Sequence, residues 1–220
     1  ALVMAHDFIF VSEVCMNKII TIGREFGSGG RELGVRLSEK LGFAYYDNEI
    51  ITEIAKRTSL SEEYVRQVAE RKPVAPLPIH VGMSFVHMPD PAFKQSIAVF
   101  AEQHKIIREM AEKSDCVIVG RCADYILREE NPFRIFVYAD QVCKLERCMA
   151  RLADGEKITE KEMKRKMNDI DRGRADYYSF FSDGKWGSRE TYDLMVNTSH
   201  RDMNKVVDAV CDYYNALFAD

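Results

Sequence analysis

The sequence predicts an α/β fold, a three-layer sandwich built around a five-stranded parallel sheet. Short runs of β-branched and aromatic residues alternate with stretches of helical periodicity, which is typical of βαβ units. The run Cys116–Val119 is apolar at every position, so its strand is expected to be covered on both faces. The stretch GREFGSGGREL, residues 23 to 33, follows the first apolar run and indicates an anion-binding loop between a strand and a helix.

Five segments are expected to form the strands of this sheet. Each is short and rich in residues that favour strands, and helical patterns separate them. Parallel strands need crossover connections of this kind, so the alternation favours a parallel sheet. The segments are Lys18–Ile22, Phe43–Tyr46, Cys116–Val119, Arg134–Ala139 and Tyr192–Val196.

Capping residues and apolar spacing predict the helices. Ser59 with Glu62, and Thr159 with Glu162, have the spacing of a capping box. Asp140 is placed to cap a helix as its N-terminal residue. Apolar residues at three- and four-residue steps indicate one long amphipathic helix before the third strand. The main helices are expected over Arg31–Leu41, Phe93–Lys113, Gln141–Ala153 and Met203–Phe218.

The composition excludes several classes of protein. With 220 residues, 46% of them hydrophobic, the chain can bury the core of one domain. The 31 basic and 35 acidic residues are mixed, so nucleic acid is not an expected partner. No apolar run approaches the ~20 residues of a membrane span. The six cysteines lack zinc spacing and C-x-x-C pairs, which is typical of buried free thiols in the cytoplasm. We expect a cytoplasmic protein with a small-molecule partner, no membrane contact and no structural metal.

The chain is expected to form a single domain over residues 16–220. Residues 1–15 precede a second methionine, Met16, and are interpreted as an extension without a function. The segment Lys72–Pro91 contains five of the six prolines and cannot continue a regular element for long. It is either a packed surface loop or a flap that closes over a substrate. The oligomeric state cannot be read from the sequence.

Two glycine-rich patterns compete for the loop after the first strand. The dinucleotide pattern G-x-G-x-x-G matches at Gly27 and Gly29 but has Glu32 where its third glycine belongs. The phosphate-loop pattern G-x-x-x-x-G-K-[ST] has Gly30 at the position of its lysine, and Arg31 comes one residue later. A glycine loop between a strand and a helix is also a common structural turn, so this loop alone leaves the choice open.

Several segments together resemble the cytidylate kinases, and most closely their cytidylate kinase-like subgroup. The resemblance runs from Met16 to the C-terminus. It rests on Ile20–Ile22 with Arg24–Glu32, Tyr46-Asp47, Val117–Arg121, Arg134–Ala139 with Arg147 and Arg151, Asp171–Tyr178 and Val196–Ser199. These kinases are P-loop enzymes that transfer the γ-phosphoryl group of ATP to a nucleoside monophosphate with Mg²⁺. The resemblance implies a monophosphate-binding and flap region over residues 48–113 and a lid region over residues 155–190.

For the ATP side, the resemblance implies that the glycine loop binds phosphates. Arg31 is expected to replace the missing lysine, with Arg24 as the second candidate. The hydroxyl that holds Mg²⁺ in the family is also absent after Gly30, so Ser28 or a water molecule is expected to serve. Asn197 is expected on the adenine side. The phosphate-binding residues would be Gly27, Ser28, Gly29, Gly30 and Arg31.

For the acceptor side, Arg121 follows a strand at its carboxyl end, where parallel sheets bind ligands. Cytidylate kinases have Gly-Arg-Asp there, and the resemblance implies that Arg121 binds the monophosphate, although a surface ion pair is the alternative. Cys122 replaces the acid, which weakens the expectation of cytidine specificity, and Asp124 could help. Asp47 is expected either to face the monophosphate or to cap a helix.

The lid candidate is the basic stretch Lys164–Arg174. It could bring Arg172 and Arg174 to the transferring phosphoryl group as catalytic residues, or it could be a solvated helix face. Asp171 matches an acid of the family that contacts substrate. The sequence therefore leaves three functions open: ATP- and Mg²⁺-dependent phosphoryl transfer to a nucleoside monophosphate such as CMP or dCMP, nucleotide binding with little turnover in a regulatory role, or phosphorylation of a small molecule that is not a nucleotide.

Overall fold

A five-stranded parallel sheet forms the centre of the protein. The computed structural model describes residues 17–69, 79–81, 84–86, 91–152 and 157–218. The strands lie in the order β2-β5-β1-β6-β7, and every neighbouring pair is parallel. They are β1 (Ile19–Arg24), β2 (Ala44–Tyr46), β5 (Cys116–Val119), β6 (Phe133–Tyr138) and β7 (Leu194–Asn197). The predicted α/β class and all five strands are confirmed, with ends that differ from the prediction by at most two residues.

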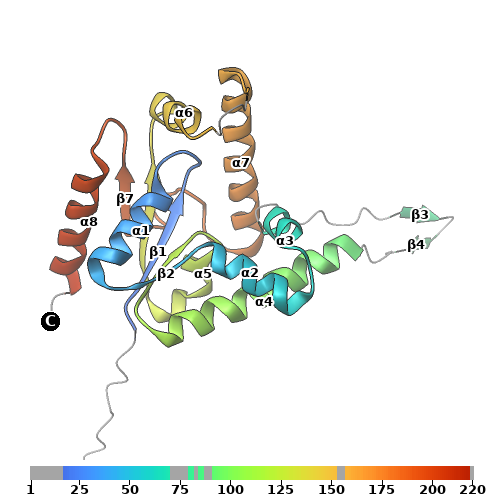
Figure 1. Cartoon of the computed structure of the whole chain (residues 1–220). Coiled ribbons are helices and arrows are strands. Elements are labelled where there is room, and N and C mark those ends of the chain that lie inside the picture. The colour runs from blue at the N-terminus through green and yellow to red at the C-terminus, as the bar shows by residue number, and fades with distance from the viewer. Residues whose placement is uncertain (1–16, 70–78, 82–83, 87–90, 153–156, 219–220) are drawn as a thin grey trace, which may run out of the picture.

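Helices cover both faces of the sheet (Figure 1). On one face, Ile20 and Ile22 pack in a buried cluster with residues of α1 (Gly30–Leu41) and α8 (Met203–Phe218). On the other face, Ile19 and Ile118 pack in a second cluster with α2 (Asn48–Thr58), α4 (Pro91–Lys113) and α5 (Ala123–Ile126). Alternate residues of the central strands are therefore buried on opposite sides, which explains their continuous apolar runs.

The remaining helices extend from this frame. They are α3 (Glu62–Val68), the 3₁₀ helix η1 (Arg128–Glu130), α6 (Gln141–Ala150) and α7 (Glu160–Phe181). The predicted capping residues Asp140 and Thr159 are confirmed, and Thr159 forms a full capping box with Glu162. The capping box predicted for Ser59 is wrong. Ser59 ends α2 in the left-handed conformation at φ 56°, and Ser61 caps α3 instead.

The chain order places a ligand site at one edge of the sheet. In the sheet, β1 lies between β5 and β6. The chain places β2 and β5 on one side of β1 and then β6 and β7 on the other, so the direction of strand addition reverses at β1. Ligands of open parallel sheets bind beyond the carboxyl ends of the strands at such a reversal. The glycine loop follows β1 and therefore lies at this position.

Other expectations concern segments outside the sheet. β3 (Ile79–Val81) and β4 (Ser84–Val86) form an antiparallel pair within the predicted flap, and the rest of Lys72–Pro91 up to residue 90 lies outside the described residues, as does the predicted 1–15 extension. None of the described helices is both long and apolar enough to cross a membrane. The described cysteines are free thiols, of which Cys148 is half-buried and the others are buried.

Candidate active site

The glycine loop is built so that only glycine fits at two of its positions. Gly27 and Gly29 have φ angles of 78° and 85°, a region that other residues rarely adopt. A Cβ atom on Gly27 would lie 2.8 Å from Cys148 Sγ, and one on Gly29 would lie 2.6 Å from Met203 Cε. Gly29 caps α1, whose first N–H groups have no acceptor within the helix. The loop therefore offers backbone donors and the positive end of a helix dipole to an anion.

Side chains behind the loop fix its shape. Thr198 Oγ1 donates a hydrogen bond of 2.6 Å to the Ser28 carbonyl oxygen, and Arg147 donates to the same oxygen at 3.2 Å. Arg147 also donates to the Thr198 carbonyl oxygen at 2.7 Å. The Ser28 hydroxyl donates to the Glu25 carbonyl oxygen at 2.8 Å, so it is engaged within the loop. The sequence did not indicate the supporting roles of Arg147 and Thr198, although Arg147 contributed to the family resemblance.

Arg24 lies between the glycine loop and the end of β5. Its side chain is 14% exposed, and its Nη2 lies 4.0 Å from Asp47 Oδ1. A Cβ atom on Gly30 would lie 2.5 Å from Arg24 Cβ, and one on Gly120 would lie 1.7 Å from Arg24 Nη1. The arginine thus passes two glycines that leave room for it, one beside its stem and one beside its guanidinium group.

Arg31 lies on the outer side of this arrangement. Its side chain is 59% exposed, and its Nε lies 2.9 Å from Asp47 Oδ2. Asp47 is buried and stands at the N-terminal position of α2, but its side chain makes no capping hydrogen bond. Its two oxygens face Arg31 and Arg24 instead. The alternative of Asp47 as a side-chain helix cap is therefore not supported.

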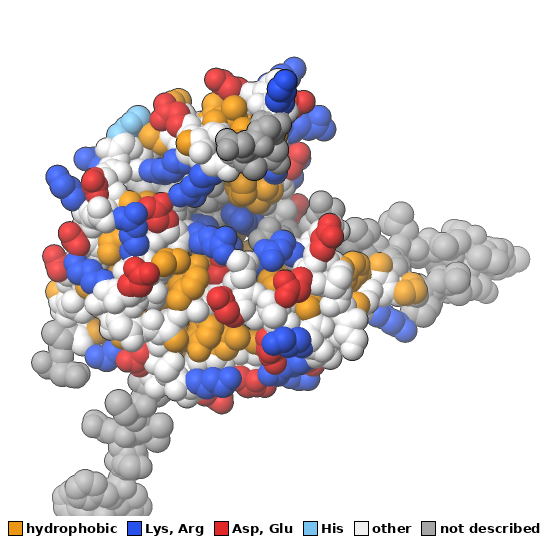
Figure 2. All heavy atoms as spheres, in the orientation of Figure 1, with side chains coloured by type: hydrophobic (Ala, Val, Ile, Leu, Met, Phe, Trp, Pro, Cys, Tyr) orange, Lys and Arg blue, Asp and Glu red, His pale blue; other side chains and the backbone are white. Residues whose placement is uncertain are grey.

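Three arginines line one pocket beside the loop. They are Arg24, Arg121 and Arg174, which come from β1, the end of β5 and α7. Arg121 is buried and left-handed at φ 61°, and Gln103 Nε2 donates a 2.9 Å hydrogen bond to its carbonyl oxygen. In Figure 2, Lys and Arg side chains gather around the hollow below α6 and α7. The concentration of positive charge suits a phosphate-bearing ligand.

The acid of this pocket is Asp124, which is buried within it. Tyr178 Oη donates a 2.6 Å hydrogen bond to Asp124 Oδ2. Burial raises the pKa of the Asp124 carboxyl, although this hydrogen bond opposes the shift. Cys122 occupies the position of the family's acid, and burial raises the pKa of its thiol well above the usual value. The acid of the Gly-Arg-Asp of cytidylate kinases is thus replaced by a buried thiol, and the carboxyl in this pocket is that of Asp124.

Asp171 connects α7 to the glycine loop and also lies 3.7 Å from Nη1 of the pocket residue Arg174. Asp171 Oδ1 accepts a 2.7 Å hydrogen bond from the Phe26 backbone N–H. Lys144 Nζ lies 3.7 Å from Asp171 Oδ2 and 2.9 Å from Glu25 Oε2. Burial raises the pKa of Asp171, an effect that exceeds the opposing effect of the Phe26 hydrogen bond. The structure thus places this acid in a contact between α7 and the loop.

The two predicted lid arginines differ in position. Arg174 lines the pocket, and its Nη1 donates a 3.3 Å hydrogen bond to the Arg24 carbonyl oxygen. Arg172 is exposed and is not among the residues that line the pocket. Trp186 packs edge-on against Phe136 with ring centroids 5.1 Å apart and also lines the pocket. The structure therefore brings one of the two lid arginines to the other cations.

The loop after β7 carries the residue expected on the adenine side. Asn197 ends β7, is exposed, and accepts a 2.9 Å hydrogen bond from the Ser199 backbone N–H. This loop reaches the N-terminus of α6 through Ser199, whose Oγ accepts a 2.8 Å hydrogen bond from the Asp140 N–H. Asn197 therefore lies at the carboxyl end of the sheet, on the strand beside β6.

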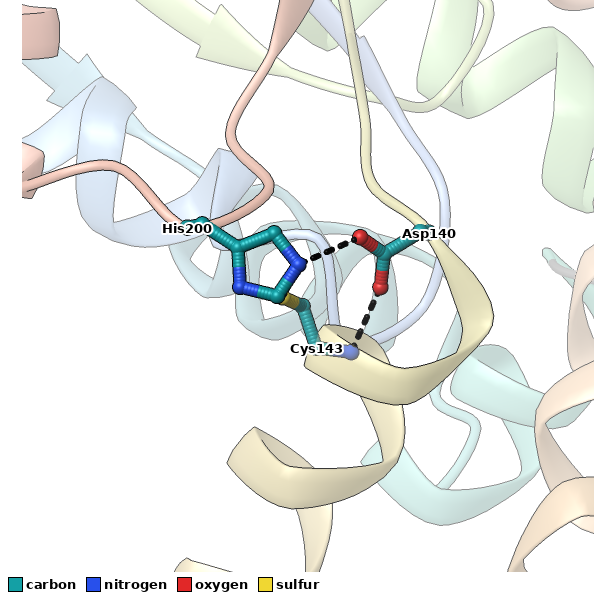
Figure 3. Close-up of side chains that lie close together, drawn as sticks. All are labelled: Asp140, Cys143 and His200. Carbon is teal, nitrogen blue, oxygen red and sulfur yellow. Dashed lines mark hydrogen bonds and ion pairs between the residues drawn. The ribbon is translucent and has the colours of Figure 1, made fainter.

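A cluster of Asp140, Cys143 and His200 joins this loop to α6 (Figure 3). His200 Nε2 lies 3.2 Å from Asp140 Oδ2, and Asp140 Oδ1 accepts a 2.7 Å hydrogen bond from the Cys143 N–H. Cys143 Sγ lies 3.4 Å from one ring nitrogen of His200 and 3.6 Å from the other. Because these distances are nearly equal, the sulfur does not lie along the lone pair of either nitrogen, and Figure 3 shows it behind the ring. The residue types could bind a metal, but this geometry suits a thiol packed on an imidazole.

The parallel sheet, the glycine loop after its central strand and the cations at the same edge define a P-loop kinase fold. The model of the cytidylate kinase-like family matches residues 19–200, and the chain belongs to this family. It is 28% identical over 200 residues to a cytidylate kinase of Methanoregula boonei (strain DSM 21154 / JCM 14090 / 6A8), covering 88% of this chain and 93% of the relative.

Solved structures agree with this fold. An uncharacterized protein from Eubacterium ventriosum ATCC 27560 has a TM-score of 0.64 and 28% identity, covering 91% of this chain and 99% of its own. A shikimate kinase from Bacteroides thetaiotaomicron has a TM-score of 0.54 and 14% identity, covering 90% of this chain and 98% of its own. At that identity the shikimate kinase supports the fold alone. The chain is therefore a member of a kinase family, and its substrate remains to be identified.

Proposed function

We propose that the protein transfers the γ-phosphoryl group of ATP to a nucleoside monophosphate of the CMP or dCMP type, with Mg²⁺, in the cytoplasm. The observation that carries this proposal is the pocket lined by Arg24, Arg121 and Arg174 beside the glycine loop. Phosphoryl transfer spreads negative charge over the moving group, so catalysis depends mainly on positioned cations. Three arginines from separate elements meet this need.

The residues present fit the phosphates of ATP. Glycine at positions 27 and 29 leaves space that a Cβ atom would fill, and the helix N-terminus behind them offers donors. Bound ATP supplies the phosphoryl group that is transferred. We propose that the amides from Gly27 to Arg31 bind its phosphates and that Asn197 contributes on the adenine side, as the family resemblance implies.

The protein offers few ligands for Mg²⁺. The Ser28 hydroxyl is engaged by the Glu25 carbonyl oxygen, and the Asp47 oxygens face two arginines. Mg²⁺ keeps several waters and is often held by substrate phosphates with one or two carboxylates. We therefore propose that the phosphates and water hold most of the Mg²⁺ coordination sphere and that Asp47 acts on it through water.

On the acceptor side, we propose that Arg121 binds the monophosphate and that Arg174 neutralises charge on the transferring group. Asp47 is proposed as an acceptor-side contact. The sequence predicts the same role for Asp171, but its hydrogen bond from the Phe26 N–H favours a role in holding the glycine loop. Residues 48–113 and 155–190 are proposed as the monophosphate-binding and lid regions. Arg172, which is exposed, is proposed to approach the site only when the lid region moves.

One observation favours a second candidate, a kinase whose acceptor is not a nucleotide. The position of the family's acid holds Cys122, and the nearby Asp124 has a pKa raised by burial. Asp124 Oδ2 also accepts a hydrogen bond from Tyr178, so part of this carboxyl is occupied and less of it is open to an amino-substituted base. Recognition of the acceptor's phosphate does not depend on this group.

An assay of ADP release against CMP, dCMP, UMP, AMP and shikimate would test the proposal. We expect turnover with a pyrimidine monophosphate and a loss of turnover in Arg121→Met. Turnover with shikimate alone would favour the second candidate. Tight ATP binding without turnover on any acceptor would instead favour a nucleotide-binding protein with a regulatory role.

A further inference from the structure

The glycine loop departs from the phosphate-loop pattern at the first glycine, at the lysine and at the hydroxyl residue after it, and the first two departures are opposite. When the second glycine of G-x-x-x-x-G-K is set on Gly29, the lysine falls on Gly30 and the first glycine falls on Arg24. The chain thus has a glycine where the pattern has its cation and a cation where the pattern has a glycine.

These two positions are in contact. A Cβ atom on Gly30 would lie 2.5 Å from Arg24 Cβ and 3.2 Å from Arg24 Cγ. Gly30 is the first residue of α1 and is not one of the described residues with positive φ. Its backbone conformation therefore does not require glycine, and the need is steric: the stem of Arg24 occupies the space that a side chain at position 30 would use.

The guanidinium group of Arg24 also lies against a glycine, Gly120. Gly120 has a φ angle of 75°, and a Cβ atom on it would lie 1.7 Å from Arg24 Nη1. The guanidinium group lies between the loop after β1 and the loop after β5, in the pocket that Arg121 and Arg174 also line. In contrast, Arg31 is 59% exposed and paired with Asp47, so it lies outside this pocket.

We propose that Arg24 and Gly30 have exchanged the roles of glycine and cation in the phosphate loop, so that Arg24 binds the ATP phosphates in place of the lysine. This inference rests on the ATP site of the proposed function. An arginine in this position presents a planar fork that can bind two phosphate oxygens at once, whereas a lysine presents one compact charge. Because Gly30 has no side chain, the stem of Arg24 can occupy the space beside it.

A set of exchange variants tests the proposal through ATP affinity, measured by calorimetry, together with the melting temperature. Arg24→Gly is expected to bind ATP about 10- to 100-fold more weakly, which corresponds to the loss of a charge-assisted hydrogen bond. Gly30→Lys alone is expected to melt at a lower temperature because its Cβ meets Arg24. The double variant Arg24→Gly/Gly30→Lys restores the first glycine and the lysine of the standard pattern, and we expect it to bind ATP at least tenfold more tightly than Arg24→Gly.

A conservative pair makes the test independent of how the double variant folds. Arg24→Lys is expected to stay within about threefold of wild-type ATP affinity, and Arg24→Gln to lose at least tenfold. Arg36→Gln is the matched control and should bind ATP as the wild type does, because Arg36 is a half-buried arginine on α1 that pairs with Glu32 and does not line the pocket. Arg24→Gln with wild-type ATP affinity would overturn the proposal, as would a well-folded double variant that binds no better than Arg24→Gly.

Two comparisons separate this proposal from its neighbours. If Arg31→Ala loses more ATP affinity than Arg24→Gln, the lysine's role belongs to Arg31, and the exchange is rejected. The ATP affinity is measured without turnover, so the two proposals can fail separately. If the wild-type protein binds ATP but phosphorylates no acceptor, the proposed function is rejected, and the affinities of the variants still decide whether Arg24 and Gly30 have exchanged roles.

Discussion

The loops after β1 and after β5 lie side by side at the carboxyl end of the sheet. The first departs from the general phosphate-loop pattern, and the second departs from the Gly-Arg-Asp of the cytidylate kinases. After β1, Gly30 stands at the position of a lysine. After β5, Cys122 stands at the position of an acid. In each case a residue of the missing charge type lies nearby in the same pocket, Arg24 for the first loop and Asp124 for the second.

The two replacements differ in the charge they deliver. Arg24 has a carboxylate, Asp47, 4.0 Å away, and a guanidinium group stays protonated at any ordinary pH. Asp124 has the neutral partner Tyr178, and its burial raises the pKa of the carboxyl. The loop after β1 therefore has a cation in place of its lysine, while the carboxyl beside the loop after β5 is already engaged by the Tyr178 hydroxyl. This difference favours unchanged ATP chemistry and an altered acceptor.

The largest effect is expected for Arg121→Met, which removes a buried cation from the acceptor side. We expect kcat/KM for the acceptor to fall at least about 100-fold, since two charge-assisted hydrogen bonds to a phosphate contribute roughly 3 kcal/mol or more. ATP affinity should stay within about threefold. Steady-state kinetics and calorimetry on the same preparation would check both values, and Arg121→Lys should recover part of the loss. Equal losses for ATP and acceptor would show that the pocket is not divided in this way.

The next effect is expected for Gly120→Ala, which acts on both loops at once. The added Cβ would lie 1.7 Å from Arg24 Nη1 and would be held at a φ of 75°. We expect the left-handed backbone to cost about 1–2 kcal/mol and the displaced Arg24 to weaken ATP binding about tenfold.

A second glycine separates these two costs. Gly42 ends α1 at a φ of 71° with nothing within 4 Å of an added Cβ, so Gly42→Ala carries the backbone cost alone. Chemical unfolding and ATP titration of both variants would give the difference. If Gly120→Ala and Gly42→Ala change the ATP affinity and the free energy of unfolding equally, the contact between position 120 and Arg24 has no effect on ATP binding.

A smaller effect is expected for Asp171→Ala, which removes one contact between α7 and the glycine loop. The Phe26 N–H loses its acceptor, and Lys144 and Arg174 each lose a carboxylate 3.7 Å away, while Arg174 keeps its hydrogen bond to the Arg24 carbonyl oxygen. We expect ATP affinity to fall about three- to tenfold, the effect of one partly exposed hydrogen bond, with little change in KM for the acceptor. A rise in the acceptor KM with unchanged ATP affinity would instead support the acceptor-side role that the sequence predicted.

Local patterns were sufficient to predict most of the fold. The apolar runs located the central strands β1 and β5 because these are buried on both faces, and the shorter patterns of β2 and β7 sufficed although these edge strands are largely half-buried. The cap of α3 was misplaced because Ser59 and Ser61 are equally good capping residues in sequence. Only the left-handed turn at Ser59, which ends the preceding helix, decides between them.

The site was less accessible to sequence reasoning because its contacts join distant segments. Arg24 and Gly120 are almost a hundred residues apart, yet a side chain at position 120 would collide with the Arg24 guanidinium group. Spacing along the chain favoured Arg31 as the cation because it follows the loop directly. The structure instead places Arg31 at the surface with Asp47. Asp171 was assigned by motif, and its hydrogen bond to Phe26 spans two elements that no local pattern connects.

The smallest effect is a pH dependence of stability that comes from Asp124. Because its pKa is raised in the folded state, the folded protein binds this proton more tightly than the unfolded chain does. Its contribution to stability is therefore fully present below the ordinary pKa of an aspartate, about 3.9, and is lost as the pH rises through the folded-state value. Asp124→Asn lacks this loss and can still accept the hydrogen bond from Tyr178.

Urea unfolding of the wild type and Asp124→Asn between pH 4 and 7 would measure this contribution. We expect the variant to gain stability relative to the wild type as the pH rises, while Asp212→Asn, on the exposed side of α8, controls for the loss of one negative charge. The opposite trend would mean that the carboxylate is stabilised in its charged form. In that case Asp124 would lie beside the loop after β5 as a stabilised carboxylate, which would favour an acceptor with an amino-substituted base.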